Sequence, residues 1–138
     1  MNGPTSRRRN ERGVSAVEFA VIGPVFILLV FLIIEAGLYF YGRNAALSAA
    51  RESVSFLRVA GTDSDPNSFE PVAADLARQY AERLGNLHGV TARAVISDDG
   101  RVQVDVSGTI DLPLGSYDVS QSAQATLEQF NRDPALSP

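Results

Sequence analysis

Residues 14–41, VSAVEFAVIGPVFILLVFLIIEAGLYFY, form an apolar stretch of 28 residues that decides the architecture of this chain. Sixteen consecutive residues, from Phe19 to Ile34, carry no charge, and a single glutamate stands at each end of that run, Glu18 and Glu35. A helix needs about 20 apolar residues to cross the hydrocarbon core of a bilayer, so the stretch predicts one transmembrane helix. A carboxylate at the edge of such a helix is costly to place, which suggests that it has a function.

The charges on either side of the stretch predict its orientation. Gly13 is preceded by four basic residues, Arg7, Arg8, Arg9 and Arg12. Basic flanks stay in the cytoplasm, so we expect the C-terminal part to be extracytoplasmic, with Tyr39 and Tyr41 at the aromatic belt of the outer interface. Residues 1–43 carry a net charge of +2 and residues 44–138 a net charge of −6. An acidic distal part argues against nucleic acid as a partner, because binding to phosphates depends on a basic surface.

Three other interpretations of the apolar stretch compete with a membrane helix. A cleaved secretory signal has a core of about 7–15 apolar residues before a small-residue site such as Ala46-Leu47-Ser48, but this core is longer and contains Glu35. Ser6-Arg7-Arg8 suggests a twin-arginine signal, yet the hydrophobic residues expected next are Arg9-Asn10-Glu11. A buried core helix of this length fits poorly in so small a globule. We therefore favour the membrane helix, with a kink or loosened turn at Pro24, where proline removes a backbone hydrogen bond.

The rest of the chain is small. At 138 residues, with about a fifth in the apolar segment, the chain leaves room for one domain with a thin core. We expect a marginal fold that a partner helps to stabilise. The absence of cysteine excludes disulfides, thiol catalysis and thiolate metal sites.

Two helices are expected before any strand. Residues 43–58 contain no helix breaker, and one helical face collects the apolar side chains Ala46, Ala49, Ala50, Val54 and Leu57, so the membrane helix is expected to continue through residue 58. Gly61 and residues 62–68 should end it. A second helix is predicted from Pro71 to Leu84, with Arg78 and Glu82 on its wet face and an apolar stripe formed by Val72, Ala73, Leu76, Ala77, Tyr80, Leu84 and Leu87.

From Val90 the apolar period changes to two, which predicts strands. Residues 90–96 and 101–106 alternate on either side of Asp98-Asp99-Gly100, and an Asp-Gly turn between alternating runs predicts a hairpin. A third run, from Thr109 to Leu114, is interrupted by Pro113 and is expected to be an edge strand. The stretch Tyr117–Leu127 fits either a strand or a helix, and residues 133–138 are expected to be disordered.

No catalytic, cofactor or metal site emerges from the sequence. His88, the only histidine, stands in a Leu-His-Gly loop, where a solvated or capping role outweighs that of a general base. Turn chemistry explains the neighbouring carboxylates Asp98 and Asp99, and no metal-ligand spacing accompanies them. The serines lack both a nucleophile elbow and a base. We predict that the protein is not an enzyme and needs no cofactor.

Residues 13–19, Gly-Val-Ser-Ala-Val-Glu-Phe, resemble the processing site of type IV prepilins, in which a short basic leader ends in glycine before an apolar helix with glutamate at its fifth position. A longer string is similar to the TadE-like family of pilus assembly proteins, the minor pseudopilins of tight-adherence (Flp-type) pili. It comprises residues 13–20, Pro24, Ile34-Glu35-Ala36-Gly37 and the segment from Asn44-Ala45-Ala46 to Ala49-Ala50-Arg51-Glu52. The likeness covers roughly residues 12–58. Where family members often continue with a second Ala-Arg pair, this chain has Ser55-Phe56-Leu57-Arg58.

The resemblance implies a processing and docking chemistry. A prepilin peptidase would cut after Gly13 and leave Val14 as a charged N-terminus. Glu18, followed by Phe19, would then neutralise the terminal amine of a neighbouring subunit, an interaction that strengthens as the dielectric constant falls. Glu35 and Pro24 are candidates for helix interactions. The implied partners are the peptidase, other pilins or pseudopilins, an inner-membrane assembly platform and the lipid bilayer.

The sequence thus predicts an α+β, pilin-like protein that spans the inner membrane once, with its N-terminus in the cytoplasm. It is divided into a basic leader (1–13), a transmembrane and extended helix (14–58), an extracytoplasmic α+β domain (59–132) and a disordered tail (133–138). Two alternatives stay open. One is an uncleaved, membrane-anchored extracytoplasmic binding module, and the other is a type II secretion pseudopilin, which shares the leader but fits the string after Pro24 less well.

Overall fold

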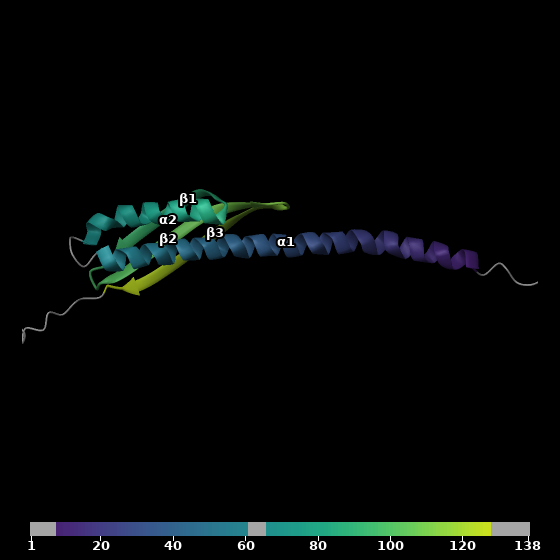
Figure 1. Cartoon of the computed structure of the whole chain (residues 1–138), viewed down its shortest axis with the longest axis horizontal. Helices are drawn as coiled ribbons and strands as arrows, with labels where there is room; N and C mark the ends of the chain where they lie inside the picture. Colours follow the sequence, from purple (N-terminus) through teal and green to yellow (C-terminus); the bar gives the residue numbers. More distant parts are fainter. Residues whose placement is uncertain (1–7, 61–65, 128–138) are drawn as a thin grey trace, which may run out of the picture. The chain divides into compact units, whose positions relative to one another are not determined.

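The computed structural model describes residues 8–60 and 66–127, and the side chains of residues 15–60 and 68–127. Within these limits the chain contains a long helix, a short 3-10 helix, a second helix and three strands: α1 (Arg8–Ala60), η1 (Pro66–Phe69), α2 (Glu70–Gly85), β1 (Leu87–Ile96), β2 (Arg101–Leu112) and β3 (Gly115–Thr126) (Figure 1). This content confirms the predicted α+β class. The chain divides into two units, one ending at Gly37 and the other beginning at Leu38. The tail predicted to be disordered lies outside the described residues.

The first unit contributes the N-terminal part of α1. The helix begins at Arg8, six residues before the predicted start at Val14, and continues without interruption through Pro24 to Ala60. Large apolar side chains on every face of this part are exposed, among them Phe19, Phe26, Leu28 and Phe31. Within the described residues, this is the one helix that is long and apolar enough to cross a membrane. A helix that is apolar all round and unburied by its own chain needs an apolar surrounding.

The second unit packs α1 and α2 together through small side chains. The predicted apolar face of α1 is confirmed, because Ala46, Ala49, Ala50, Val54 and Leu57 are buried. On α2 the buried residues are Ala73, Ala77, Ala81 and Gly85, four residues apart. Gly85 shows how closely the helices approach, because a Cβ atom added there would lie 3.1 Å from the Cβ atom of Ala45. The absence of a side chain at Gly85 lets the two helices come together at this point.

The bounds of α2 match the prediction within a residue at each end, but its buried face does not. Pro71 lies in the first turn, and the helix ends at Gly85, followed by Asn86, whose φ of 50° is in the left-handed region typical of a C-cap. The predicted stripe was wrong in part, since Val72 and Leu84 are exposed and Leu87 begins β1. The small residues turn inward instead, and α2 lies close to β1 as well as to α1 at Gly85. Arg78 lies on the wet face as predicted, paired with Asp75 and Glu82.

The sheet is a three-stranded antiparallel meander in the order β1-β2-β3. Its predicted first hairpin is confirmed: the Ser97 amide donates to the Arg101 carbonyl at 2.8 Å, and Gly100 takes a φ of 77° in the turn. One face of β2 is buried, through Val102, Val104, Val106 and Ile110. The opposite face is polar and partly exposed, and its side chains bond across the strands, as in the 2.8 Å contact between Thr91 Oγ1 and Ser107 Oγ. The sheet therefore buries one face only.

The predicted third strand was wrong in its bounds. Residues Thr109–Leu112 continue β2, which is the central strand, and Pro113 lies in the turn that follows rather than in an edge strand. The continuation is possible because Gly108 fits opposite an irregularity in β1, where an added Cβ atom would lie 3.1 Å from Val90 Cγ2. The sequence allowed either a strand or a helix for residues 117–127, and the structure shows a strand, β3. This strand pairs with β2 from Leu112↔Gly115 to Arg101↔Thr126.

Candidate functional site

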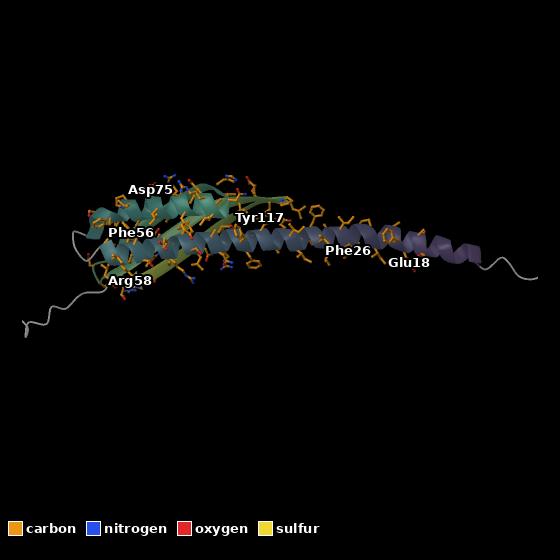
Figure 2. The ribbon with its side chains drawn as sticks, viewed as in Figure 1. Glu18, Phe26, Phe56, Arg58, Asp75 and Tyr117 are labelled. Atoms are coloured by element: carbon orange, nitrogen blue, oxygen red, sulfur yellow. The ribbon has the colours of Figure 1, made fainter. Side chains whose placement is uncertain are left out.

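Glu18 lies in the exposed apolar part of α1. Its neighbours Val17 and Phe19 are 66% and 78% exposed, and Figure 2 shows Glu18 and Phe26 pointing away from the helix. An ionised carboxylate among apolar side chains is stable only where it reaches water, a cation or a hydrogen-bond donor. The surface around Glu18 is therefore suited to a partner that supplies positive charge within an apolar setting.

The two residues at the expected cleavage point precede Glu18 on the same helix. Gly13 and Val14 belong to α1, and the side chain of Val14 lies outside those described. Val14 and Glu18 are four positions apart, and residues at this spacing share one face of a helix. The helix thus carries the candidate N-terminus and the candidate carboxylate on one face, one turn apart.

The other two candidates on α1 differ in their surroundings. Pro24 is an exposed residue inside the helix. Glu35 is buried, with 7% of its surface exposed, although the preceding residues Ile33 and Ile34 are 63% and 49% exposed. The structure does not bring Glu18 and Glu35 together, because they are 17 positions apart along one helix.

Contacts with neighbouring residues account for the polar side chains of the domain that the sequence singled out. Asp99 accepts hydrogen bonds from the Arg101 amide at 3.2 Å and from Arg101 Nε at 2.7 Å, and the arginine lowers the pKa of Asp99 below its ordinary value. His88 Nε2 stands 3.9 Å from Asp111 Oδ2, and both side chains are exposed. Among residues 8–60 and 66–127, no group of three or more histidine, aspartate or glutamate side chains could hold a metal ion.

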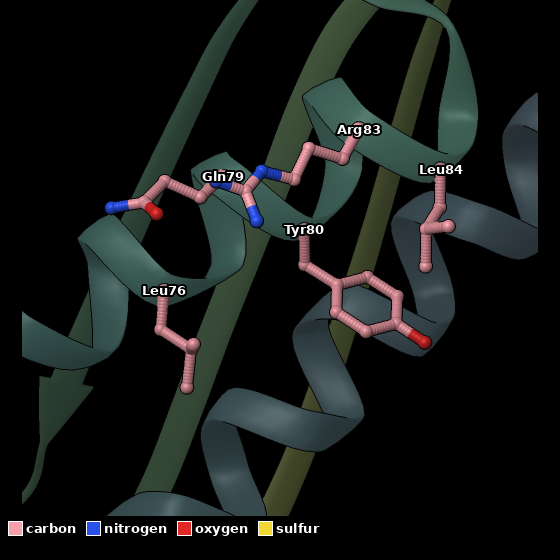
Figure 3. A pocket seen from close by; sticks show the side chains of 5 residues that line it. All are labelled: Leu76, Gln79, Tyr80, Arg83 and Leu84. Atoms are coloured by element: carbon pink, nitrogen blue, oxygen red, sulfur yellow. The ribbon is translucent and has the colours of Figure 1, made fainter.

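A groove of about 310 Å³ runs along α2. It is lined by Leu76, Gln79, Tyr80, Arg83 and Leu84, and in Figure 3 the Tyr80 ring points from α2 toward α1. Tyr80 is partly buried and packs against the core, while Leu84 is 47% exposed. The lining contains one charged group, Arg83, and lacks the paired acid and base that hydrolytic chemistry needs.

Sequence reasoning missed one exposed feature. The turn between β2 and β3 consists of apolar residues, and Leu114 is 55% exposed while Tyr117, just beyond the turn, is 43% exposed. The signal was present in the sequence as Leu112-Pro113-Leu114, an apolar run at a point where turns are usually polar. It was assigned instead to a strand.

These features define a class of protein in which one helix, long and apolar enough to span a membrane, continues into a small α+β domain. A family model described as TadE-like protein matches residues 13–55, which is α1 from the expected cleavage point to the alanine face that packs against α2. The match confirms the resemblance to TadE-like pilus assembly proteins over that segment and includes Glu18, Pro24 and Glu35. No curated protein and no solved structure matches the chain.

Proposed function

We propose that this protein is a minor pseudopilin that takes part in assembly of a tight-adherence (Flp-type) pilus and is a structural component rather than an enzyme. The observation that carries the proposal is the carboxylate of Glu18 on an otherwise apolar, exposed stretch of α1, within the segment similar to TadE-like proteins. A lipid-facing helix gains nothing from such a group. A helix that docks beside other helices can use it.

In the proposed mechanism, a prepilin peptidase removes residues 1–13 and leaves the amine of Val14 as a positive charge. Glu18 then accepts the Val14 amine of a neighbouring pilin or pseudopilin. In an apolar setting the attraction between two such charges is several-fold stronger than in water. Because each charge is stable there only when it is paired, the contact sets the register of adjacent helices as well as holding them. The apolar part of α1 lies in the inner membrane before assembly, with the α+β domain extracytoplasmic and the assembly platform as a further partner.

Processing is tested by the intact mass of membrane-extracted protein from cells that contain the peptidase. We expect the wild-type chain to begin at Val14 and the Gly13→Leu variant to keep its leader, because the peptidase requires a small residue before the cut. Gly3→Leu, which changes the leader away from the cut, is the control and should be processed normally. A wild-type mass of the full precursor would favour the uncleaved binding module.

Docking is tested by Glu18→Gln in a deletion strain, with pili counted by electron microscopy. We expect normal membrane insertion and cleavage but loss of piliation, since the neutral amide leaves the neighbouring amine unpaired. Glu52→Gln, which changes an exposed carboxylate in the other half of α1, is the matched control and should restore pili. Normal piliation by Glu18→Gln at normal protein level would rule out the docking role.

A further inference from the structure

The turn between β2 and β3 exposes apolar surface where a turn normally carries polar groups. Pro113 and Leu114 form the turn, with Leu112 and Gly115 as the last strand pair before it. Leu114 is 55% exposed and Pro113 is exposed as well. Solvent-exposed turns favour Gly, Asn, Asp and Ser, because these residues adopt the turn conformation and bond to water. Apolar side chains gathered at an exposed turn indicate a surface that contacts something other than water.

The position of the turn is set by contacts within the second unit. The Tyr117 ring lies 6.3 Å from the Tyr39 ring, edge to face, and Tyr39 makes a similar contact with Phe40 at 5.9 Å. Tyr39 stands on α1 near the C-terminal end of the apolar stretch, and its neighbours Phe40 and Tyr41 are 56% and 57% exposed. Figure 1 shows the β2–β3 turn extending beyond the C-terminal end of α2. The turn therefore lies beside the residues of α1 at which the apolar stretch ends.

We propose that this turn inserts shallowly into the outer interface of the bilayer that α1 crosses, as a second membrane contact beside the helix. The inference rests on the membrane anchoring in the proposed function. Tyrosine is favoured at the membrane interface, where its ring meets apolar chains and its hydroxyl meets water. Tyr39, Tyr41 and Tyr117 would form that belt, and Leu114 would enter the apolar side of it.

Two carboxylates limit the depth of insertion. The strand pair next to Leu112↔Gly115 is Asp111↔Ser116, in which Ser116 Oγ donates to Asp111 Oδ1 at 2.6 Å. Two pairs further, Thr109 Oγ1 donates to Asp118 Oδ1 at 3.0 Å. Adjacent pairs are about 3.3 Å apart along a strand, so the polar boundary lies within one residue of the turn. Residues 112–117 include no basic side chain, so the contact is with apolar chains and neutral headgroups and needs no anionic lipid.

The test uses the complete chain in phosphatidylcholine vesicles that contain a lipid with a nitroxide on its headgroup. Because the chain has no cysteine, Leu114→Cys, Val72→Cys and Leu28→Cys each provide one labelling site for an environment-sensitive fluorophore. Val72 is 52% exposed at the other end of α2 and is the matched control, while Leu28 lies in the apolar stretch and reports anchoring itself. Pro113→Cys is a second site in the turn in case Leu114→Cys disturbs the fold.

We expect the label in the turn to be quenched by the lipid nitroxide several-fold more strongly than the label at position 72, and equally with or without anionic lipid. Quenching of the turn label by aqueous iodide alone, as at position 72, would overturn the proposal. If the label at position 28 were still quenched by the lipid nitroxide, the membrane anchoring of α1 would stand. Protection of the turn label from both quenchers would also overturn it, since a second protein surface would then cover the turn. A position 28 label that is open to iodide would overturn the anchoring and this proposal together.

Discussion

The two halves of α1 belong to one continuous helix, yet they are built for different surroundings. The half before Leu38 carries large apolar side chains, such as Phe26, Leu28 and Phe31, and its own chain leaves them exposed. The half after it buries alanines against α2 and the sheet. Hydrophobicity and side-chain size both separate the halves, because residues 19–34 carry no charge while the second half contains Arg43, Arg51 and Glu52. Small residues mark the part that another backbone approaches, and large ones mark the part that meets lipid or another subunit.

The strongest test of this difference compares one substitution in the two halves. Leu57→Ala should cost about 2–5 kcal/mol of domain stability, because Leu57 is fully buried and its removal leaves a cavity. Leu28→Ala removes the same atoms from an exposed site and should leave the domain unchanged. Chemical unfolding of the full chain in detergent, followed by circular dichroism, measures both. Equal losses would mean that the two halves do not differ in packing.

The reverse substitution tests the role of small side chains. Ala49→Leu adds volume at a fully buried position and should cost about 1–3 kcal/mol through overpacking. Ala20→Leu makes the same change where α1 is exposed, so the unfolding midpoint of the domain should not move. A tolerated Ala49→Leu would show that the second half of α1 is looser than its buried alanines indicate.

A comparable effect is expected at the junction of α2 with the sheet. The Ile96 amide donates to Glu70 Oε1 at 2.7 Å, which ties the first residue of α2 to the end of β1 in a partly buried place. Glu70→Ala should cost about 1.5–3 kcal/mol, the range for a hydrogen bond to a charged group. Glu82→Ala, which breaks an exposed pair with Arg78, should cost less than about 1 kcal/mol. The urea midpoints of the two variants provide the comparison.

The smallest effect is expected on the stability of the domain at acidic pH. Hydrogen bonds from the Arg101 side chain and amide lower the pKa of Asp99 from its ordinary value of 3.8. A carboxyl whose pKa is lower in the folded state stabilises the fold above its unfolded pKa, and that contribution is lost as the pH falls through the folded value. Below about pH 4, the free energy of unfolding of Asp99→Asn should therefore decrease slightly less steeply with falling pH than that of the wild type. Parallel acid titrations of the two proteins, with Asp98→Asn as the control, measure the difference.

Local signals in the sequence predicted much of the fold. The length of the apolar stretch, the first-turn Pro71 and the Asp99-Gly100 turn each act within a few residues, so the long helix, the bounds of α2 and the first hairpin followed from them. Glu18 was found the same way, because a charge in an apolar run is visible without a structure. Its docking role stays a prediction.

The predictions from sequence were wrong where the local structure depends on contacts with a segment far away in the chain. Whether Thr109–Leu112 continues β2 or starts a new strand depends on how Gly108 fits opposite β1, which no local pattern records. The amphipathic pattern of α2 identified a helix but not its inner face, since both Leu76 and Ala77 fit an apolar stripe.

The sequence by itself determined that this protein has one membrane-length helix, a carboxylate at its edge and an α+β domain, because helix length, charge and turn chemistry are properties of neighbouring residues. Only the tertiary structure decided that alanines rather than leucines form the buried face of α2, and that the turn after β2 lies beside Tyr39. Those outcomes depend on the distance between backbones and on strand register, and both are set by segments far apart in the chain.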